Sequence, residues 1–229
     1  MRAGLGEVAV HALTPPPGLL WLAAVWRQDI LFRVRVSHQV AALTLDDGPD
    51  PMLTPRVLDA LDRHRAKATF FLIGERAVAE PELVRLIRTK GHEVGNHLWR
   101  EERAAGLSDE AFESSLLRTH VALGSPRLFR PGSGLVSRRK VAIAGRYGYR
   151  CALGSVYPYD AHLRPRPRII AAMARRIAPG DIIILHEGQP SRASVVPALD
   201  ALLTTLQVRG YRVVAAGALH DVGALQGST

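Results

Sequence analysis

The chain has 229 residues, of which 47% are apolar, so it can bury one sizeable core and is not a disordered chain. Its single cysteine, Cys151, excludes an internal disulfide and a cysteine-based zinc cluster. The formal net charge is +9, yet no basic run is interleaved with aromatic residues. We therefore expect no nucleic-acid partner, and at most a general attraction to anionic surfaces such as a cell envelope.

The first 40 residues are predicted to form an N-terminal extension that precedes the main domain or packs on it. Residues 18–26 are apolar, but nine residues are too few to span a bilayer as a helix, and no convincing signal-peptide cleavage site follows them. We expect a short helix there and a strand over residues 30–36. The alternatives are a targeting segment or an interfacial anchor, which would be the chain's only membrane contact. Cell envelope and cytoplasm both stay open as compartments, and so does the oligomeric state.

From residue 41 onward, predicted strands alternate with predicted helices. Apolar or alternating segments predict strands at residues 41–46, 68–74, 92–96, 127–130, 149–154, 181–186 and 211–216. Helical spacing of apolar residues predicts helices at residues 54–64, 81–91, 108–124, 137–148, 167–180 and 192–210. Thr54 is expected to cap the first of these, and Pro197 to kink or restart the last. The alternation predicts a parallel sheet covered by helices, either a (β/α) barrel or a doubly wound sheet.

Polar or titratable side chains end or follow five of these strands. They are Asp46 and Asp47, His97, Arg130, Asp160 and His186. In both architectures ligands bind beyond the carboxyl ends of the strands. Five strands from distant segments that each deliver such a residue are hard to explain by chance, so we expect these residues to share one active site.

The doubled aspartate needs its own explanation. Two adjacent carboxylates repel each other, and burying either one is costly unless something compensates the charge. A bound cation, a proton moved during catalysis, or solvent exposure would each relieve the repulsion.

Several of these stretches resemble motifs of the polysaccharide deacetylases, the NodB-like carbohydrate esterases. TLDDGPD at residues 44–50 resembles the first motif, FRPGSG at 129–134 the third, and IILHEG at 183–188 the fifth. The resemblance covers roughly residues 41–215 and implies an α/β fold, a distorted (β/α)7 barrel. It implies a catalytic domain over residues 41–229, after an extension at residues 1–40.

The first and fifth motifs imply the main chemical roles. Asp46 would be the general base and Asp47 a metal ligand. His186 would be the general acid that protonates the leaving amine, since an imidazole donates a proton near neutral pH. Leu185 would line the acetyl pocket.

The second motif departs from the family pattern. GNHLWRE at residues 95–101 keeps His97, but Glu101 stands where the family has a second histidine. A spacing of four places both side chains on one face of a helical turn, so Glu101 is the expected third metal ligand. The alternative is a solvated Glu101 beside a metal that binds poorly or not at all.

The third and fourth motifs also depart. In the third, the resemblance implies that Arg130 pairs with the catalytic carboxylate, while Ser133 replaces a tyrosine and would offer its backbone N–H to the oxyanion. In GSVYPYDAH at residues 154–162, Asp160 matches a carboxylate that steers the arginine or the histidine. Tyr157 is expected to stack on a sugar, with a packing role as the alternative.

We therefore expect a metal-dependent hydrolase that removes acetyl groups from N-acetylated sugars of a glycan such as a chitooligosaccharide, peptidoglycan or a related polymer. Zinc is the first candidate for the divalent metal ion, and cobalt, nickel and manganese are alternatives. Two other functions stay open: a deacylase acting on another amide or an O-acetyl ester, and a metal-free glycan-binding pseudoenzyme.

Overall fold

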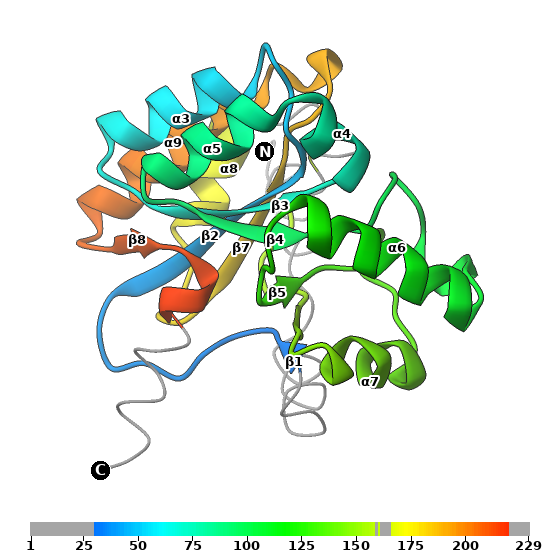
Figure 1. Ribbon diagram of the computed structural model, residues 1–229. Helices are drawn as coiled ribbons and strands as arrows, with labels where there is room; N and C mark the ends of the chain where they lie inside the picture. Colours follow the sequence, from blue (N-terminus) through cyan, green and yellow to red (C-terminus); the bar gives the residue numbers. More distant parts are fainter. Residues whose placement is uncertain (1–29, 159, 161–165, 220–229) are drawn as a thin grey trace, which may run out of the picture.

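The computed structural model describes residues 30–158, 160 and 166–219, which form a parallel sheet surrounded by helices (Figure 1). The strands are β1 (Ile30–Leu31), β2 (Val40–Gly48), β3 (Ala68–Leu72), β4 (Glu93–Asn96), β5 (Leu128–Phe129), β6 (Arg150–Ala152), β7 (Ile182–His186) and β8 (Arg212–Val214). The α-helices are α3 (Thr54–Arg63), α4 (Gly74–Ala79), α5 (Pro81–Thr89), α6 (Asp109–Ala122), α7 (Arg138–Arg146), α8 (Pro167–Ala174) and α9 (Val195–Val208). Two short 3-10 helices, η1 (Ala104–Gly106) and η2 (Pro190–Arg192), lie in loops.

The sheet curls into a distorted barrel. Its strand order is β1-β6-β5-β4-β3-β2-β7, all neighbours are parallel, and β8 pairs with the first residues of β2. After β6, Val156 forms a parallel bridge to Ile183 of β7, which links the two ends of the sheet. This closure confirms the barrel and excludes the alternative architecture, a doubly wound sheet.

The helices form a continuous outer layer. Neighbouring contacts run in the order α8, α9, α3, α5, α4, α6, α7, and Figure 1 shows α3, α5, α8 and α9 together on one side of the sheet. Because side chains alternate along a strand, Leu43 and Leu45 of β2 pack under these helices, while Thr44 and Asp46 face the other way. The barrel interior therefore receives the polar residues of β2. No helix in the described ranges is both long enough and apolar enough to span a membrane.

Two expected elements differ from the structure. The strand expected at residues 30–36 is wrong beyond its first two residues, because only β1 pairs with β6 before the chain leaves the sheet. This short strand belongs to the barrel sheet although it falls within the predicted extension. Helix α4 was not predicted, since its six residues are too few for a periodic pattern. The helix expected at residues 18–26 lies outside the described residues.

Two predictions about helix ends are also wrong. Leu53, not Thr54, takes the cap position of α3, because the Thr54 hydroxyl accepts from the Asp50 N–H and donates to Glu187. Pro197 neither kinks nor restarts α9, since it lies in the first turn, where a missing N–H costs no helical hydrogen bond.

Candidate active site

A bulge at the end of β2 brings two adjacent aspartates to one site. In a regular strand, neighbouring side chains point to opposite faces. The pairing between β2 and β3 shifts register between Asp46 and Gly48, and Asp47 has a φ of 72°, in the left-handed region. Asp46 and Asp47 are 3% and 6% exposed, so both carboxylates are buried and need partners.

Arg130 is the partner of Asp46. Its Nη1 lies 2.6 Å from Asp46 Oδ1 and also donates to the Thr44 hydroxyl at 2.6 Å, while its Nε donates to the Ala152 carbonyl at 2.7 Å. The guanidinium stacks 4.2 Å from the centre of the Phe71 ring. Arg130 thus compensates the charge of Asp46 and is held in place by the strands around it.

His186 stands beside Asp46 at the carboxyl end of β7 and is oriented by Asp160. Asp46 and His186 are register partners in the sheet. Asp160 accepts from the backbone N–H of His186 at 2.6 Å, and its other oxygen lies 3.0 Å from Nδ1. This leaves Nε2 facing Asp46 Oδ2 at 3.9 Å, and the Tyr157 ring lies 5.4 Å from the imidazole, centre to centre. Tyr157 therefore packs on His186, and its stacking on a sugar stays a prediction.

The surroundings of His186 favour its protonated form. Burial alone would lower the pKa of His186, but the hydrogen bond to Asp160 and the negative charges of Asp160, Asp46 and Asp47 raise it overall. A proton on Nε2 points into the site, as a general acid requires.

Asp47 pairs with His97, which directly follows β4. Asp47 Oδ1 lies 3.1 Å from His97 Nε2, and His97 Nδ1 is buried without a hydrogen-bond partner among the described residues. Burial alone would raise the pKa of Asp47, but the hydrogen bond to His97 and the nearby positive charges hold it well below its usual range. Asp47 is therefore a carboxylate at neutral pH.

Glu101 reaches the same site, but not from a helix. Residues 97–103 form a loop, because the Asn96 side chain accepts from the Leu98 N–H and Leu98 has a φ of 67°. The argument from helical spacing is therefore wrong. The Glu101 carboxylate accepts from Arg76 and Gln189, each at 2.9 Å. Its side chain is 45% exposed.

Comparison with known proteins decides the family. The family model described as polysaccharide deacetylase matches residues 33–152, more than half of the chain. The chain belongs to the polysaccharide deacetylase family. It is 36% identical to a peptidoglycan-N-acetylglucosamine deacetylase of Bacillus cereus, over 81% of this chain and 90% of that protein. It is 35% identical to a chitooligosaccharide deacetylase of a Bradyrhizobium species, over 78% of this chain and 89% of that protein.

Solved structures agree with this assignment. The crystal structure of a peptidoglycan N-acetylglucosamine deacetylase superimposes with a TM-score of 0.81 at 27% identity, covering 90% of this chain and 97% of that one. The neighbours share the NodB-type (β/α)7 barrel, so the predicted fold is confirmed. They include peptidoglycan deacetylases and a pseudoenzyme of the same family. This chain is thus a member of a hydrolase family whose enzymes generally depend on a divalent metal ion.

The metal ligands expected in this deacetylase fit at two positions and not at the third. Two ligands of one metal ion at about 2.1 Å lie roughly 3 Å apart, which matches the 3.1 Å between Asp47 Oδ1 and His97 Nε2. Glu101 instead turns towards Arg76, Gln189 and Arg192. Among the described residues, no three His, Cys, Asp or Glu side chains are grouped as metal ligands. As arranged, the residues do not form a complete metal site.

Two predicted substrate contacts have different outcomes. Ser133 lies exposed in the loop after Arg130, with a φ of 62°, and its oxyanion role stays a prediction. Leu185 is fully buried in the core beneath the outer helices, so it cannot line an acetyl pocket in this arrangement. Because strand neighbours alternate, Ile184 shares the face of His186 and is partly exposed. The two-residue period of a strand could have shown this from the sequence.

Three titratable residues of this deacetylase site were not predicted. Arg192 in η2 pairs with Asp47, Arg76 in α4 pairs with Glu101, and Glu187 is fully buried behind the bulge. Only Glu187 carried a sequence signal, since it directly follows His186. Gly188 allows these loops to meet, because a Cβ there would lie 2.0 Å from the Asp47 carbonyl oxygen.

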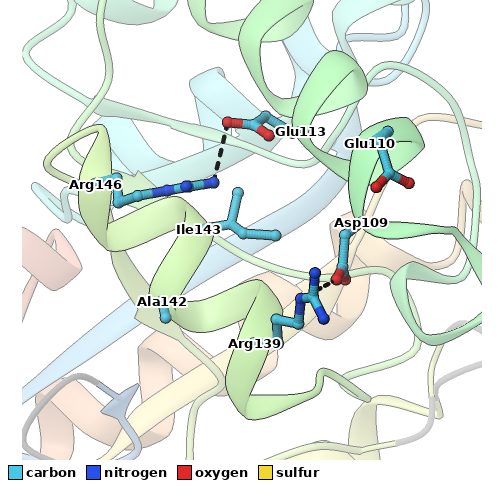
Figure 2. Close-up of a pocket in the computed structure, with 7 residues that line it drawn as sticks. All are labelled: Asp109, Glu110, Glu113, Arg139, Ala142, Ile143 and Arg146. Atoms are coloured by element: carbon cyan, nitrogen blue, oxygen red, sulfur yellow. Dashed lines mark hydrogen bonds and ion pairs between the residues drawn. The ribbon is translucent and has the colours of Figure 1, made fainter.

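A groove of about 430 Å³ between α6 and α7 lies apart from this site (Figure 2). Ion pairs cross it, between Arg146 and Glu113 and between Arg139 and Asp109. None of the predicted catalytic or metal-binding residues lines it. Its charges are paired with each other across two outer helices, so we assign the chemistry to the barrel mouth.

Proposed function

We propose that the chain hydrolyses the acetamide group of N-acetylated sugars in a glycan, with Asp46 and His186 as base and acid. One observation carries the proposal: at the carboxyl end of the barrel, Asp46 is paired with Arg130 and faces a His186 imidazole that Asp160 orients. At the same end of the barrel, the carboxylate can accept a proton and the protonated imidazole can donate one.

The reaction needs one water molecule. Asp46 takes a proton as the water oxygen bonds to the acetyl carbon, and Arg130 holds the carboxylate during this transfer. His186 then donates its Nε2 proton to the sugar nitrogen as the carbon–nitrogen bond breaks, so that the products are acetate and a free amine. Asp160 keeps the imidazole in the tautomer that presents Nε2. The Ser133 N–H is proposed to donate to the oxyanion.

A divalent metal ion, zinc first, would polarise the acetyl carbonyl and the water when bound. Asp47 and His97 would hold it, and Glu101 would become the third ligand only after turning away from its present partners. Carboxylate oxygens at two of three positions also suit cobalt or manganese.

Peptidoglycan is the first proposed substrate and chitooligosaccharide the second. The support is the similarity to relatives named for these two substrates, at 36% and 35% identity. The net charge of +9 also favours approach to an anionic cell envelope.

Acetate release tests the proposal. The purified chain, supplied with zinc or cobalt, is incubated with peptidoglycan fragments, chitooligosaccharides and an O-acetylated sugar ester. We expect acetate from the N-acetylated glycans. Acetate from the ester alone would support the deacylase alternative, and glycan binding without acetate from any substrate would support the pseudoenzyme.

A further inference from the structure

The guanidinium of Arg192 occupies the position between the two carboxylates expected to hold a metal ion. Its Nη1 donates to Asp47 Oδ2 and, at 2.8 Å, to the Glu187 carbonyl oxygen. Its Nη2 lies 3.6 Å from Glu101 Oε1. The Arg192 side chain is only 12% exposed, so the guanidinium is part of the site and not a surface charge.

The arginine is held there by more than charge. It lies in η2, in the loop after β7, and that loop also sends Gln189 to Glu101 at 2.9 Å. The Glu187 carbonyl fixes the same guanidinium nitrogen that reaches Asp47. The loop after β7 is thus fastened to the loop after β4 through two contacts to Glu101.

The guanidinium and a metal ion need the same oxygens. Asp47 has one oxygen on His97 and the other on Arg192, so both are engaged. Glu101 accepts from Arg76 and Gln189 and faces Arg192. A divalent cation bound between these carboxylates would lie at short range from the guanidinium, and the repulsion is little screened because Asp47 and Arg192 are mostly buried.

We propose that Arg192 is a built-in cation that competes with a divalent metal ion for Asp47 and Glu101. The metal ion binds only when the guanidinium moves away, and Glu101 turns inward in the same step. This proposal rests on the deacetylase function proposed above, because that function is the reason to expect a metal ion at this site. It makes the loop after β7 a device that sets how tightly this chain holds its metal.

Cobalt titration of the apo-protein by calorimetry tests the competition directly. We compare the wild-type chain with Arg192→Gln, which removes the charge, and with Arg192→Lys, which keeps it. We expect Arg192→Gln to bind cobalt about ten- to a hundredfold more tightly, the range for losing one charge-assisted hydrogen bond, and Arg192→Lys to stay near wild type. Equal or weaker binding by Arg192→Gln would overturn the proposal, and so would a lysine variant as tight as the glutamine variant.

A control variant tests whether the loss of a positive charge raises cobalt affinity only at the Arg192 position. Arg63→Gln removes the same charge at the far end of α3, where the exposed Arg63 pairs with Asp200, and should leave cobalt affinity unchanged. A tenfold gain there would overturn the assignment to Arg192. Circular dichroism verifies the fold of each variant.

A second measurement does not depend on any variant. In a crystal of the wild-type chain soaked in cobalt, we expect the metal ion at Asp47 and His97, with Arg192 turned away from Asp47. A bound cobalt ion with Arg192 still on Asp47 Oδ2 would overturn the proposal. The titration and the soak report on metal binding alone, so their outcome is separate from whether the chain releases acetate.

Discussion

Glu187 is a buried carboxyl group that the fold keeps protonated at neutral pH. It is fully buried, and its Oε1 accepts from the Thr54 hydroxyl at 3.0 Å. Its Oε2 has no hydrogen-bond partner among the described residues. Burial raises the pKa of Glu187 to about 8. The negative charges of Asp50 and Asp47 raise it further, and the hydrogen bond from Thr54 lowers it by less than these two effects raise it.

The raised pKa costs stability as the pH rises. Below pH 4.5 the group is protonated in both the folded and the unfolded chain, so it has no effect. Between pH 4.5 and about 8 only the unfolded chain loses the proton, and the free energy of unfolding falls by about 1.4 kcal/mol per pH unit. Above about pH 8 the loss is complete, at no more than about 5 kcal/mol in total.

The change Glu187→Gln removes this titration and keeps an oxygen for Thr54. We expect the urea unfolding free energy of Glu187→Gln to rise relative to wild type from pH 5 to pH 8, since groups shared by both chains cancel in the difference. Glu82→Gln, at an exposed position of α5, is the control and should give a constant difference. If the wild-type and Glu187→Gln values stayed parallel over this range, a neutral buried Glu187 would be refuted.

Three further predictions concern the barrel mouth. Replacing Arg130 by Met should lower the urea unfolding free energy by about 3–5 kcal/mol, because Asp46 keeps a buried charge without its partner; a loss below about 1 kcal/mol would contradict this. Asp160→Asn should lower the pKa of His186 and move the alkaline limb of the acetate-release profile to lower pH, and an unmoved limb would argue against His186 as the acid. Gly132→Ala should cost about 1–3 kcal/mol of stability by thermal unfolding, because its Cβ would lie 2.2 Å from a backbone carbonyl oxygen; an unchanged Tm would contradict the close approach.

The sequence predicted the alternating strands and helices because their causes are local, while the choice of a barrel over a doubly wound sheet came from the family resemblance. Apolar strands and periodic helices can be recognised within short windows, and Ser108 caps α6 by accepting from the Ala111 N–H at 3.1 Å, as its position indicates. The clustering of the polar residues that end the strands could also be predicted, because parallel strands place their carboxyl ends together. The structure accordingly brings Asp46, Arg130 and His186 into contact.

The contacts that depend on loop geometry could not be predicted. Arg192 and Asp47 are 145 residues apart, and no local pattern marks one arginine among many as the partner of a carboxylate. The second motif failed for a related reason. The argument from helical spacing assumed a helix after His97. In the structure the Asn96 side chain accepts a hydrogen bond from the Leu98 N–H, and the backbone there forms a loop.

The most direct measurement of the central claim is the rate of acetate release from an N-acetylated peptidoglycan fragment by wild type and by Asp46→Asn. The account predicts that the rate falls by about 10²- to 10⁴-fold in Asp46→Asn with the circular dichroism spectrum unchanged, because the amide cannot take the proton from water. A rate within about twofold of wild type, in a variant that is folded and free of contaminating enzyme, would contradict the claim that Asp46 is the base.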